Sequence, residues 1–275
     1  MENLKDSLFN FSQKVVLVTG ANGQVGLSLV KKLVEQNAKV VAVDLKVNNL
    51  KTLKISNKIK ESQLLILKKD IKNLLQVKKV FLEGEKKFKY INALVCNAGV
   101  AVFENYLVRT EKALDKVIDV NIKGTFYCIR EFIKNHNKNH GCGVIVNVAS
   151  HYGLISPDPR IYTDTKRASS EIYGASKAAI IQMTKYFAVH SIKKNIRTNS
   201  ISPGGISDDN NEIGKEVLQK IKQGNGFKNE YSKRCPMGRL AKINEVVDPI
   251  LFLLSSSSSY INGHNLVVDG GYTIW

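Results

Sequence analysis

Residues 14–26 of the chain read KVVLVTGANGQVG. The first six residues form a short, β-branched apolar run without alternation, which is typical of a strand buried on both faces of a sheet. Gly20, Gly23 and Gly26 follow, and apolar residues at helical spacing continue through Val34. A glycine turn between a strand and a helix lets the backbone approach a pyrophosphate, which the helix N-terminus can bind. The stretch therefore predicts a nucleotide-binding unit at the start of an α/β domain.

A second strand is predicted over residues 38–44, AKVVAVD, and it ends in Asp44. An acid at the tip of the second strand can accept hydrogen bonds from the hydroxyls of an adenosine ribose. Asp44 could instead be a simple turn residue, but the preceding glycine turn favours the ribose role. Its charge would repel a 2′-phosphate, so NAD is the expected cofactor and NADP is less favoured. Lys46 is a nearby basic residue that argues against this preference.

Strands and helices alternate along the rest of the chain. Further strands are predicted over 63–67, 91–96, 143–148, 195–201 and 264–269, and further helices over 71–87, 110–136, 171–192 and 244–255. The alternation predicts an α/β fold, a doubly wound parallel sheet of seven strands with helices on both faces, as a single Rossmann-like domain over residues 1–275. Two segments, 151–170 and 205–236, interrupt the pattern after strand ends. Because ligands bind at that edge of open α/β sheets, both are expected to cover a substrate.

Composition limits the classes of partner. The 41 Lys and Arg residues exceed the 24 Asp and Glu residues, giving a net charge of +17. The lysines are scattered and lack interleaved aromatics, so we expect a solvated surface and no nucleic-acid partner. No apolar run could span a bilayer and the N-terminus lacks an apolar signal core, which predicts no membrane partner and a cytoplasmic location. The four cysteines lack metal-like spacing, which predicts reduced thiols and no metal site.

Residues 170–179, SEIYGASKAA, have the pattern of a proton-transfer site. On a helix, Tyr173 and Lys177 would lie one turn apart on the same face. An ammonium beside the phenol would lower the tyrosine pKa from about 10 toward the working pH. Such a tyrosine could exchange a proton with an alcohol oxygen. Taken alone, the pair is weak evidence, because a half-buried tyrosine beside a solvated lysine is common.

The chain contains a second Tyr-x-x-x-Lys pair, Tyr162 with Lys166. Two prolines precede it, and threonine and aspartate fill its gap with residues of low helix propensity. Without a helix, the four-residue spacing would not place the lysine over the phenol. Good helix formers surround Tyr173 instead, and Ser170 suits a helix N-terminus. Tyr173 is therefore predicted to be the catalytic tyrosine, and Tyr162 a substrate-side or surface residue.

Eight short motifs follow one another along the chain: TGANGQVG at 19–26, Asp70, NAG at 97–99, Asn121 in NIKG, Ser150 in VNVAS, YGASK at 173–177, PG at 203–204 and VDGG at 268–271. In this order they resemble the single-domain branch of the short-chain dehydrogenase/reductase family, over nearly the whole chain. The resemblance implies an NAD(P)-dependent oxidoreductase that transfers a hydride between nicotinamide and a secondary alcohol or ketone.

The resemblance also implies roles for individual residues. Tyr173 would be the acid/base, and Lys177 would hold the nicotinamide ribose and lower the tyrosine pKa. Ser150 would polarise the substrate oxygen, and Asn121 would hold a water in a proton relay, although singly they could be a turn former and a polar helix residue. The implied cofactor-binding residues are Gly20, Asn22, Gln24, Val25, Gly26, Asp44, Asp70, Ile71, Asn97, Ala98, Gly99, Tyr173, Lys177, Pro203, Gly204 and Ile206.

The sequence departs from the family pattern at three places, one of which is the absence of the threonine often found shortly after the Pro-Gly turn, with Asp208 near its place. Gln24 stands where this branch usually has glycine, and the glycine spacing matches the extended, nucleotide-sugar branch, whose longer C-terminal domain is absent. The polar insert at 151–170 separates Ser150 from Tyr173, which is similar to reductases of bacterial surface-sugar and flagellin-glycan pathways. The alternatives are a nucleotide-sugar epimerase or dehydratase that uses NAD catalytically, and a non-catalytic nucleotide-binding scaffold on the same fold.

The insert predicts a small polar substrate, anionic and possibly a sugar derivative, because its side chains are basic and hydroxylated. The candidate substrate residues are Ser150, His151, Arg160, Tyr162 and Arg167. Family resemblance further implies a homo-tetramer or dimer through the helices at 110–136 and 171–192. The apolar residues on the second helix, such as Ile180, Ile181, Met183 and Phe187, could equally be ordinary core.

Overall fold

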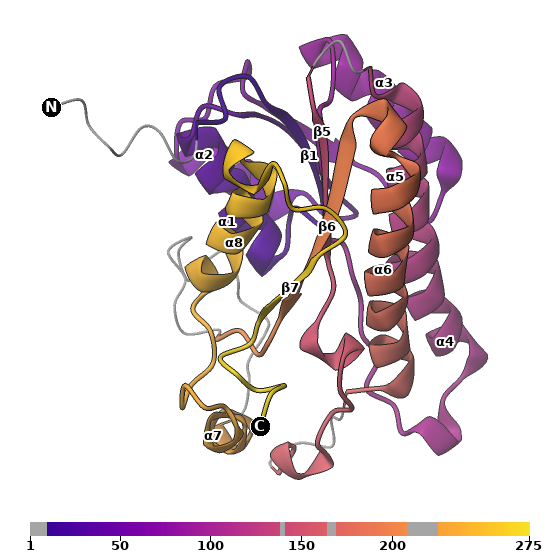
Figure 1. The fold of residues 1–275 in the computed structure, drawn as a ribbon, viewed down its shortest axis with the longest axis vertical. Coiled ribbons are helices and arrows are strands. Elements are labelled where there is room, and N and C mark those ends of the chain that lie inside the picture. The colour runs from indigo at the N-terminus through magenta and orange to yellow at the C-terminus, as the bar shows by residue number, and fades with distance from the viewer. Residues whose placement is uncertain (1–9, 138–140, 164–168, 208–224) are drawn as a thin grey trace, which may run out of the picture.

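Seven parallel strands form one sheet in the order β3-β2-β1-β4-β5-β6-β7 (Figure 1). The computed structural model describes residues 10–137, 141–163, 169–207 and 225–275. The strands are β1 (Val15–Thr19), β2 (Lys39–Asp44), β3 (Leu64–Lys68), β4 (Ala93–Cys96), β5 (Gly143–Val148), β6 (Ile196–Pro203) and β7 (Asn265–Val268). The strand order reverses between β1 and β4, which is where such sheets bind ligands. The predicted doubly wound fold is confirmed.

Strand β1 is central to the fold because it pairs with β2 on one side and β4 on the other. Each of its five residues is buried, as a strand covered on both faces requires. Its last residue, Thr19, is level with Val43 of β2 and Cys96 of β4. The glycine turn after Thr19 therefore begins at the point where the strand order reverses.

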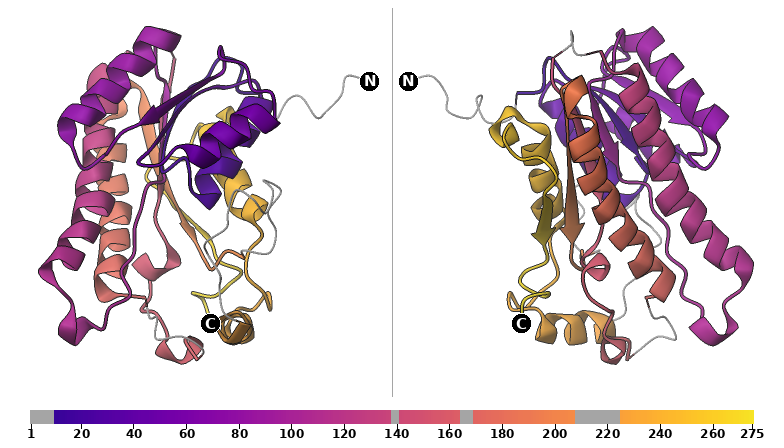
Figure 2. Two further views of the ribbon diagram at one scale, coloured as in Figure 1. Left: turned by 180° about the vertical axis from the view of Figure 1, so that it is seen from behind. Right: turned by 45° about the vertical axis from the view of Figure 1, so that its right-hand side comes forward.

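Helices cover both faces of the sheet (Figures 1 and 2). One face carries α1 (Gln24–Glu35), α2 (Asn48–Ser56) and α8 (Ile243–Leu254), and the other carries α3 (Leu74–Phe88), α4 (Glu111–Val117), α5 (Thr125–Asn135) and α6 (Glu171–His190). Each layer has its own apolar core, one with Leu33 and Ile250 and the other with Phe81 and Phe132. The sheet is thus held rigidly from both sides, which fixes the strand ends that carry the candidate site.

Two helical regions differ from the prediction. The single helix predicted over 110–136 is α4, a π-helical segment at Ile118–Gly124, and α5. Asn121 lies in the middle of that segment, and π-helical turns are frequent at functional sites. Helix α2 was not predicted, because only Leu50 and Leu53 of its nine residues are buried and leave little apolar periodicity.

The two segments expected to cover a substrate pack against each other beyond the strand ends (Figure 2). The insert forms 3-10 turns at His151–Gly153 and Pro159–Ile161, and the later segment contains α7 (Asn225–Arg234). Arg234 Nε lies 2.8 Å from Asp158 Oδ2 of the insert. Trp275 Nε1 donates to the Arg234 carbonyl at 2.6 Å, so the chain end joins the same assembly.

The described helices include none with the length and apolar character needed to cross a bilayer. The four cysteines are free thiols. Burial raises the pKa of Cys128 to about 12 and that of Cys96 well above its usual value, so both stay protonated at neutral pH.

Candidate active site

The glycine turn is locked against the end of β4. Gly20 has a φ of +63°, and a Cβ there would lie 2.6 Å from the Ala98 Cα. A Cβ on Gly26 would lie 2.3 Å from the Gly20 carbonyl oxygen. Asn97 Nδ2 donates to the carbonyls of Thr19 at 3.1 Å and Gly20 at 2.9 Å. The close approaches at Gly20 and Gly26 require glycine. Together with the hydrogen bonds from Asn97, they fix the position of the turn at the end of the sheet.

A cavity beside this turn has the character of a nucleoside site. It is lined by Gly20, Val43, Asp44, Leu45, Lys69, Asp70, Ile71, Ala98, Gly99, Val100 and Val120. Asp44 accepts hydrogen bonds from the backbone N–H groups of Asn22 at 3.0 Å and Lys46 at 3.1 Å. Lys69, the basic residue in the lining, lies 2.8 Å from Glu83 and is neutralised by it. The cavity therefore offers carboxylates to ribose hydroxyls and disfavours an additional phosphate.

Three predicted cofactor residues are outside the linings of both cavities described for the site: Gly26, whose contacts are given above, and Asn22 and Gln24. The Asn22 side chain accepts from the Leu50 N–H at 3.1 Å, which anchors the start of α2 to the turn. Gln24 Nε2 donates to the Ser207 carbonyl at 2.8 Å. The glutamine that departs from the family pattern thus links the turn to the segment after β6. Any contact that these three residues make with a cofactor stays a prediction.

A second cavity of about 280 Å³ adjoins the first at Gly99 and Val100. It is lined by Val25, Asn97, Gly99, Val100, Ala101, Val148, Ala149, Ser150, Tyr173, Lys177, Pro203, Gly204 and Ile206. The structure thus brings three of the four predicted catalytic residues to one cavity, together with the predicted Pro-Gly turn. The two adjoining cavities together extend from Asp44 to Tyr173, and we call them the cavity path.

Tyr173 and Lys177 lie on the first turns of α6, as predicted. Ser170 caps this helix, and its Oγ accepts from the Tyr173 N–H at 3.3 Å. Lys177 Nζ lies 5.6 Å from the centre of the Tyr173 ring and donates to the Val148 carbonyl at 2.8 Å. The helix therefore holds the phenol and the ammonium on one face. Tyr162 follows a 3-10 turn, and Lys166, its partner in the second pair, lies outside the described residues.

The predicted lowering of the Tyr173 pKa is wrong. Burial raises the pKa of the phenol, and its hydrogen bond with Ser150 only partly opposes this. Burial also lowers the pKa of Lys177 to about 8, because the ammonium has lost its water. Desolvation is thus the largest influence on both pKa values, and the ammonium lies over the ring. Because its pKa is raised, the Tyr173 phenol stays protonated at neutral pH and can act as a proton donor.

Asn121 is fully buried behind the cavity. Its Nδ2 donates to Ser176 Oγ at 2.9 Å and to the Val100 carbonyl at 3.0 Å, and its Oδ1 accepts from the Val100 N–H at 2.8 Å. A Cβ on Gly99 would lie 3.3 Å from Lys177 Nζ and 3.6 Å from Asn121 Oδ1. Asn121 therefore ties the π-helical segment to β4 and α6, and its water-relay role stays a prediction.

His151 does not line the cavity, although it was predicted to contact a substrate. It is 3% exposed, and its Nδ1 lies 2.9 Å from the Pro203 carbonyl. Because a carbonyl only accepts, Nδ1 carries the proton. On the other side of this turn, Tyr231 Oη accepts from the Gly205 N–H at 2.6 Å. His151 and Tyr231 therefore position the Pro203–Gly205 turn.

Sequence reasoning missed Tyr231. Its ring fills the space beside the turn, since a Cβ on Gly204 would lie 2.7 Å from its Oη. Phe227 precedes Tyr231 by one helical turn, and their rings are 5.8 Å apart. This aromatic pair at i, i+4 in a glycine- and asparagine-rich segment was the signal that could have found it.

Arg160, the one basic substrate residue that lies in the described part of the insert, does not line the cavity. Arg160 bonds to Asp158 at 2.9 Å, and its side chain is 77% exposed. Arg167 lies outside the described residues, as does Lys166. Tyr162 is half-buried, and its phenol oxygen is 3.3 Å from that of Tyr152. The structure thus removes the support that Arg160 gave to an anionic substrate.

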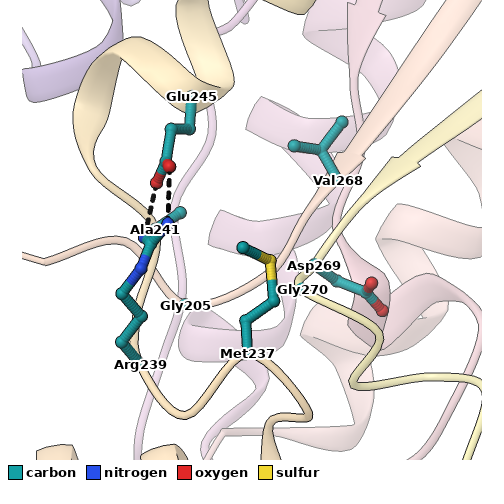
Figure 3. Close-up of a pocket in the computed structure, with 8 residues that line it drawn as sticks. All are labelled: Gly205, Met237, Arg239, Ala241, Glu245, Val268, Asp269 and Gly270. Carbon is teal, nitrogen blue, oxygen red and sulfur yellow. Dashed lines mark hydrogen bonds and ion pairs between the residues drawn. The ribbon is translucent and has the colours of Figure 1, made fainter.

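A smaller cavity lies behind the Pro-Gly turn (Figure 3). It is lined by Gly205, Met237, Arg239, Ala241, Glu245, Val268, Asp269 and Gly270. Arg239 donates to both carboxylate oxygens of Glu245, at 2.6 and 2.7 Å. Asp269 accepts from the N–H groups of Gly271 and Thr273, each at 2.9 Å. Protein groups thus satisfy the charged side chains of this cavity, which supports the turn from behind.

Known proteins resemble this chain in sequence and in fold. A family model described as enoyl-(acyl carrier protein) reductase matches residues 20–273. The crystal structure of a short chain dehydrogenase from Leptospira borgpetersenii with bound NAD+ superposes with a TM-score of 0.81 and 32% identity, covering 100% of this chain and 97% of that one. The chain belongs to the short-chain dehydrogenase/reductase family. The recognition made from the motifs is confirmed.

Two further members of the short-chain dehydrogenase/reductase family bear on its function. An NAD-dependent glycerol dehydrogenase of Listeria innocua is 34% identical over 98% of this chain and 97% of its own length. Post-translational flagellin modification protein A of Campylobacter coli is 27% identical over 94% of this chain and 98% of its own length. The second match agrees with the similarity inferred from the insert. This chain is an NAD(P)-dependent oxidoreductase of the family.

Proposed function

We propose that this enzyme transfers a hydride between NAD and a secondary alcohol or ketone of a small polar molecule. The observation that supports this most strongly is the single path of two cavities, with Asp44 at one end and Ser150, Tyr173 and Lys177 at the other. A nucleoside would bind at the carboxylate end, and a nicotinamide beside Pro203. NAD dependence of the Listeria innocua relative agrees with this.

The residues of the path fit the cofactor. Asp44 would bind the ribose hydroxyls, the turn from Gly20 to Gly26 would bind the pyrophosphate, and Lys177 would bind the second ribose. When bound, NAD accepts or donates the hydride. Tyr173 would give its proton to the substrate oxygen during reduction and take one back during oxidation, while Ser150 donates a hydrogen bond to the same oxygen.

The test of this function is a screen of secondary alcohols, in which NADH absorbance is followed for the wild type, Tyr173→Phe and Tyr162→Phe. Removing the proton donor should lower kcat by about three orders of magnitude or more, since general acid–base catalysis contributes about 10²–10⁴-fold. NAD binding measured by calorimetry should survive in Tyr173→Phe. A large loss in Tyr162→Phe together with an active Tyr173→Phe would contradict the assignment.

Cofactor preference gives a second test. The Asp44 carboxylate and the neutralised Lys69 should disfavour the 2′-phosphate, so kcat/KM with NAD should exceed that with NADP by about tenfold or more, or ~1.4 kcal/mol. Asp44→Ser should reduce that ratio, because the repelling charge is gone. Equal kcat/KM values for the two cofactors in the wild type would show that Asp44 does not select NAD over NADP.

The same screen separates two alternatives. An epimerase or dehydratase returns the hydride within one cycle, so product would form without net NADH. A nucleotide-binding scaffold would bind NAD and convert nothing. Net NADH that depends on Tyr173 is the result expected of an oxidoreductase.

Homo-oligomer formation stays a prediction. Ile180 and Ile181, proposed as possible contacts, are buried in the core at 1% and 7% exposure. Exposed apolar side chains do occur on α5 and α6, among them Phe126, Tyr186 and Val189. Light scattering should give a mass that is two or four times the 30.6 kDa of one chain, and the mass of a single chain would refute the prediction.

A further inference from the structure

Two walls of the cavity that holds Tyr173 come from separate elements. Val100 and Ala101 belong to the loop that joins β4 to α4, whereas Tyr173 belongs to the first turn of α6. Helix α4 packs beside α6 (Figure 1). The position of one wall relative to the other therefore depends on what joins this loop to the start of α6.

Arg109 joins the loop to the helix through a bidentate pair of hydrogen bonds. Its Nε donates to Glu171 Oε1 at 2.7 Å, and its Nη2 donates to Glu171 Oε2 at 2.9 Å. Nη2 also donates to the Glu104 carbonyl at 2.7 Å, and the Thr110 N–H donates to the Glu104 carboxylate at 3.4 Å. Glu171 is the first residue of α6 and stands two positions before Tyr173. One guanidinium thus binds both the loop and the helix start.

The surroundings of Arg109 distinguish this ion pair from an exposed one. The Arg109 side chain is 5% exposed, whereas that of Glu171 is 54% exposed. A guanidinium that has lost its water requires an anionic partner, and in the described part of the chain the carboxylate paired with it is that of Glu171. The hydrogen bond from Arg109 lowers the pKa of Glu171, so this carboxylate stays ionised at neutral pH. Its negative charge also suits the positive N-terminal end of α6.

Apolar packing also joins the start of α6 to the loop. Ile172 packs against an apolar cluster that contains Val102, Ala113 and Val117. Apolar contacts are non-directional, so by themselves they let the helix start rotate or slide. A planar guanidinium that bonds to both oxygens of one carboxylate fixes distance and orientation together. The ion pair therefore supplies an orientation that the apolar packing does not.

We propose that Arg109 is a positioning residue, which acts through Glu171 to hold the Tyr173 phenol in place opposite the wall of Val100 and Ala101. This inference rests on the proposed function and adds to it a residue outside the cavity. A displacement of roughly 1 Å at a reacting centre lowers the rate by about 10²-fold. An ion pair that served stability alone would leave the rate of the folded enzyme unchanged.

The first test measures NADH formation by Arg109→Met from 2-butanol, 2,3-butanediol and glycerol. Methionine fills apolar space that the arginine stem occupied, and it leaves the exposed Glu171 carboxylate to water. We expect kcat to fall about tenfold or more, while the Kd for NAD stays within about twofold, because Asp44 and the glycine turn have contacts of their own. Arg109→Lys should recover only part of the loss, since an ammonium lacks the planar fork.

Lys32→Met is the matched control. It removes the cation of another ion pair between two elements, because Lys32 on α1 lies 2.5 Å from Asp248 on α8. Its kcat should equal that of the wild type. A loss in Lys32→Met as large as that in Arg109→Met would show that kcat follows general stability, and would overturn the positioning role.

A double-variant cycle tests whether Arg109 acts through Glu171. Glu171→Gln removes one of the two carboxylate oxygens and the charge, so its kcat should also fall. The double variant Arg109→Met, Glu171→Gln should have the kcat of Arg109→Met, because the second change removes an interaction that is already lost. Losses that multiply in the double variant would show independent action and would contradict the inference.

Hydrogen exchange gives a readout that requires no turnover. Backbone amides of residues 171–177 should exchange about tenfold faster in Arg109→Met than in the wild type, while those of residues 180–190 keep their rates. Unchanged exchange at 171–177, or an unchanged kcat, would overturn the positioning role and leave the proposed function intact. No NADH from any of the three alcohols with the wild type would overturn the proposed function, and this inference with it.

Discussion

The two ends of the cavity path are built in different ways. At the nucleoside end, Gly20 and Asn97 follow directly after β1 and β4, Asp44 is the last residue of β2, and their contacts are largely with backbone groups. At the substrate end, the cavity is lined by residues at the ends of β5 and β6 and on α6, and the insert and α7 lie beyond it, where side chains such as Asp158 and Arg234 join them across long stretches of sequence. The first end is a property of the sheet, and the cover beyond the second end is a property of side-chain packing.

This difference indicates which part of the site can vary in sequence without loss of the fold. The strand ends are fixed by the sheet register, so the nucleoside end has little freedom to change without loss of the fold. The cover segments contact the sheet through a few side chains and can be exchanged to suit a new substrate. Three variants test this contrast.

The largest effect should follow from breaking the glycine turn at the nucleoside end. In Gly26→Ala the new Cβ would meet backbone atoms of Gly20 and Ala21 at 2.3 and 2.6 Å, so the turn must shift. We expect a loss of about 3 kcal/mol in unfolding free energy by chemical denaturation, the upper range for overpacking, and much weaker NAD binding. Gly23→Ala is the matched control, because its Cβ would meet only the Gly20 carbonyl oxygen, at 3.5 Å. Equal stability losses in the two variants would contradict the rigid turn.

Lys177→Met should reduce activity and increase stability. Burial lowers the Lys177 pKa from 10.5 to about 8, so the folded protein pays for the buried ammonium at pH 7. Removing it should add about 2 kcal/mol to the unfolding free energy, after about 1 kcal/mol is lost with the hydrogen bond to Val148. Between pH 8 and 10.5, Lys177 is neutral in the folded protein but still protonated in the unfolded chain. The unfolding free energy of the wild type therefore rises with pH over this interval, and the stability gain of Lys177→Met should shrink. A gain that does not change with pH, or that also appears in Lys185→Met on the exposed side of α6, would argue against this cause.

The smallest effect concerns the Pro203–Gly205 turn, which contributes Pro203 and Gly204 to the substrate end. His151→Leu removes the donor to the Pro203 carbonyl and should raise the KM for NAD about fivefold, or ~1 kcal/mol. His151→Asn keeps a donor near the Nδ1 position and should restore most of the affinity. Burial also lowers the His151 pKa below its usual value of 6.5. As the pH drops below 6.5, the unfolded chain takes up a proton at His151 before the folded protein does, so the unfolding free energy of the wild type should fall. Both variants lack this histidine and should not show its contribution to the fall. An asparagine variant as weak as the leucine variant would exclude the positioning role.

The strand ends were predictable from the sequence because local rules specify them. Apolar runs predicted the seven strands. The glycine turn and the acid at the strand ends predicted the places of Gly20 and Asp44, and good helix formers predicted the helix of Tyr173. Whether each of these residues contacts a cofactor stays a prediction. The fold and the cavity at the strand ends thus followed from periodicity and turn chemistry.

The contacts beyond the strand ends were not predictable in this way. His151 was expected at the substrate and is buried against Pro203, because a residue 52 positions away supplies its partner. Tyr231 and the Asp158–Arg234 ion pair depend on the docking of α7 onto the insert, which no local pattern specifies. The π-helical segment around Asn121 keeps ordinary helical periodicity on both sides, so the sequence predicted one continuous helix.

The central position of β1 has a consequence for synthesis on the ribosome. Asn97, which ties the glycine turn to the sheet, lies 78 residues after Thr19. At 5–20 residues per second, β1 waits about 4–16 s before the strand that covers its second edge can emerge. Until then, an apolar edge is open to chaperones or to another nascent chain. The nucleoside end of the site would therefore first become competent to bind when the nascent chain reaches β4, well before the substrate end has been made.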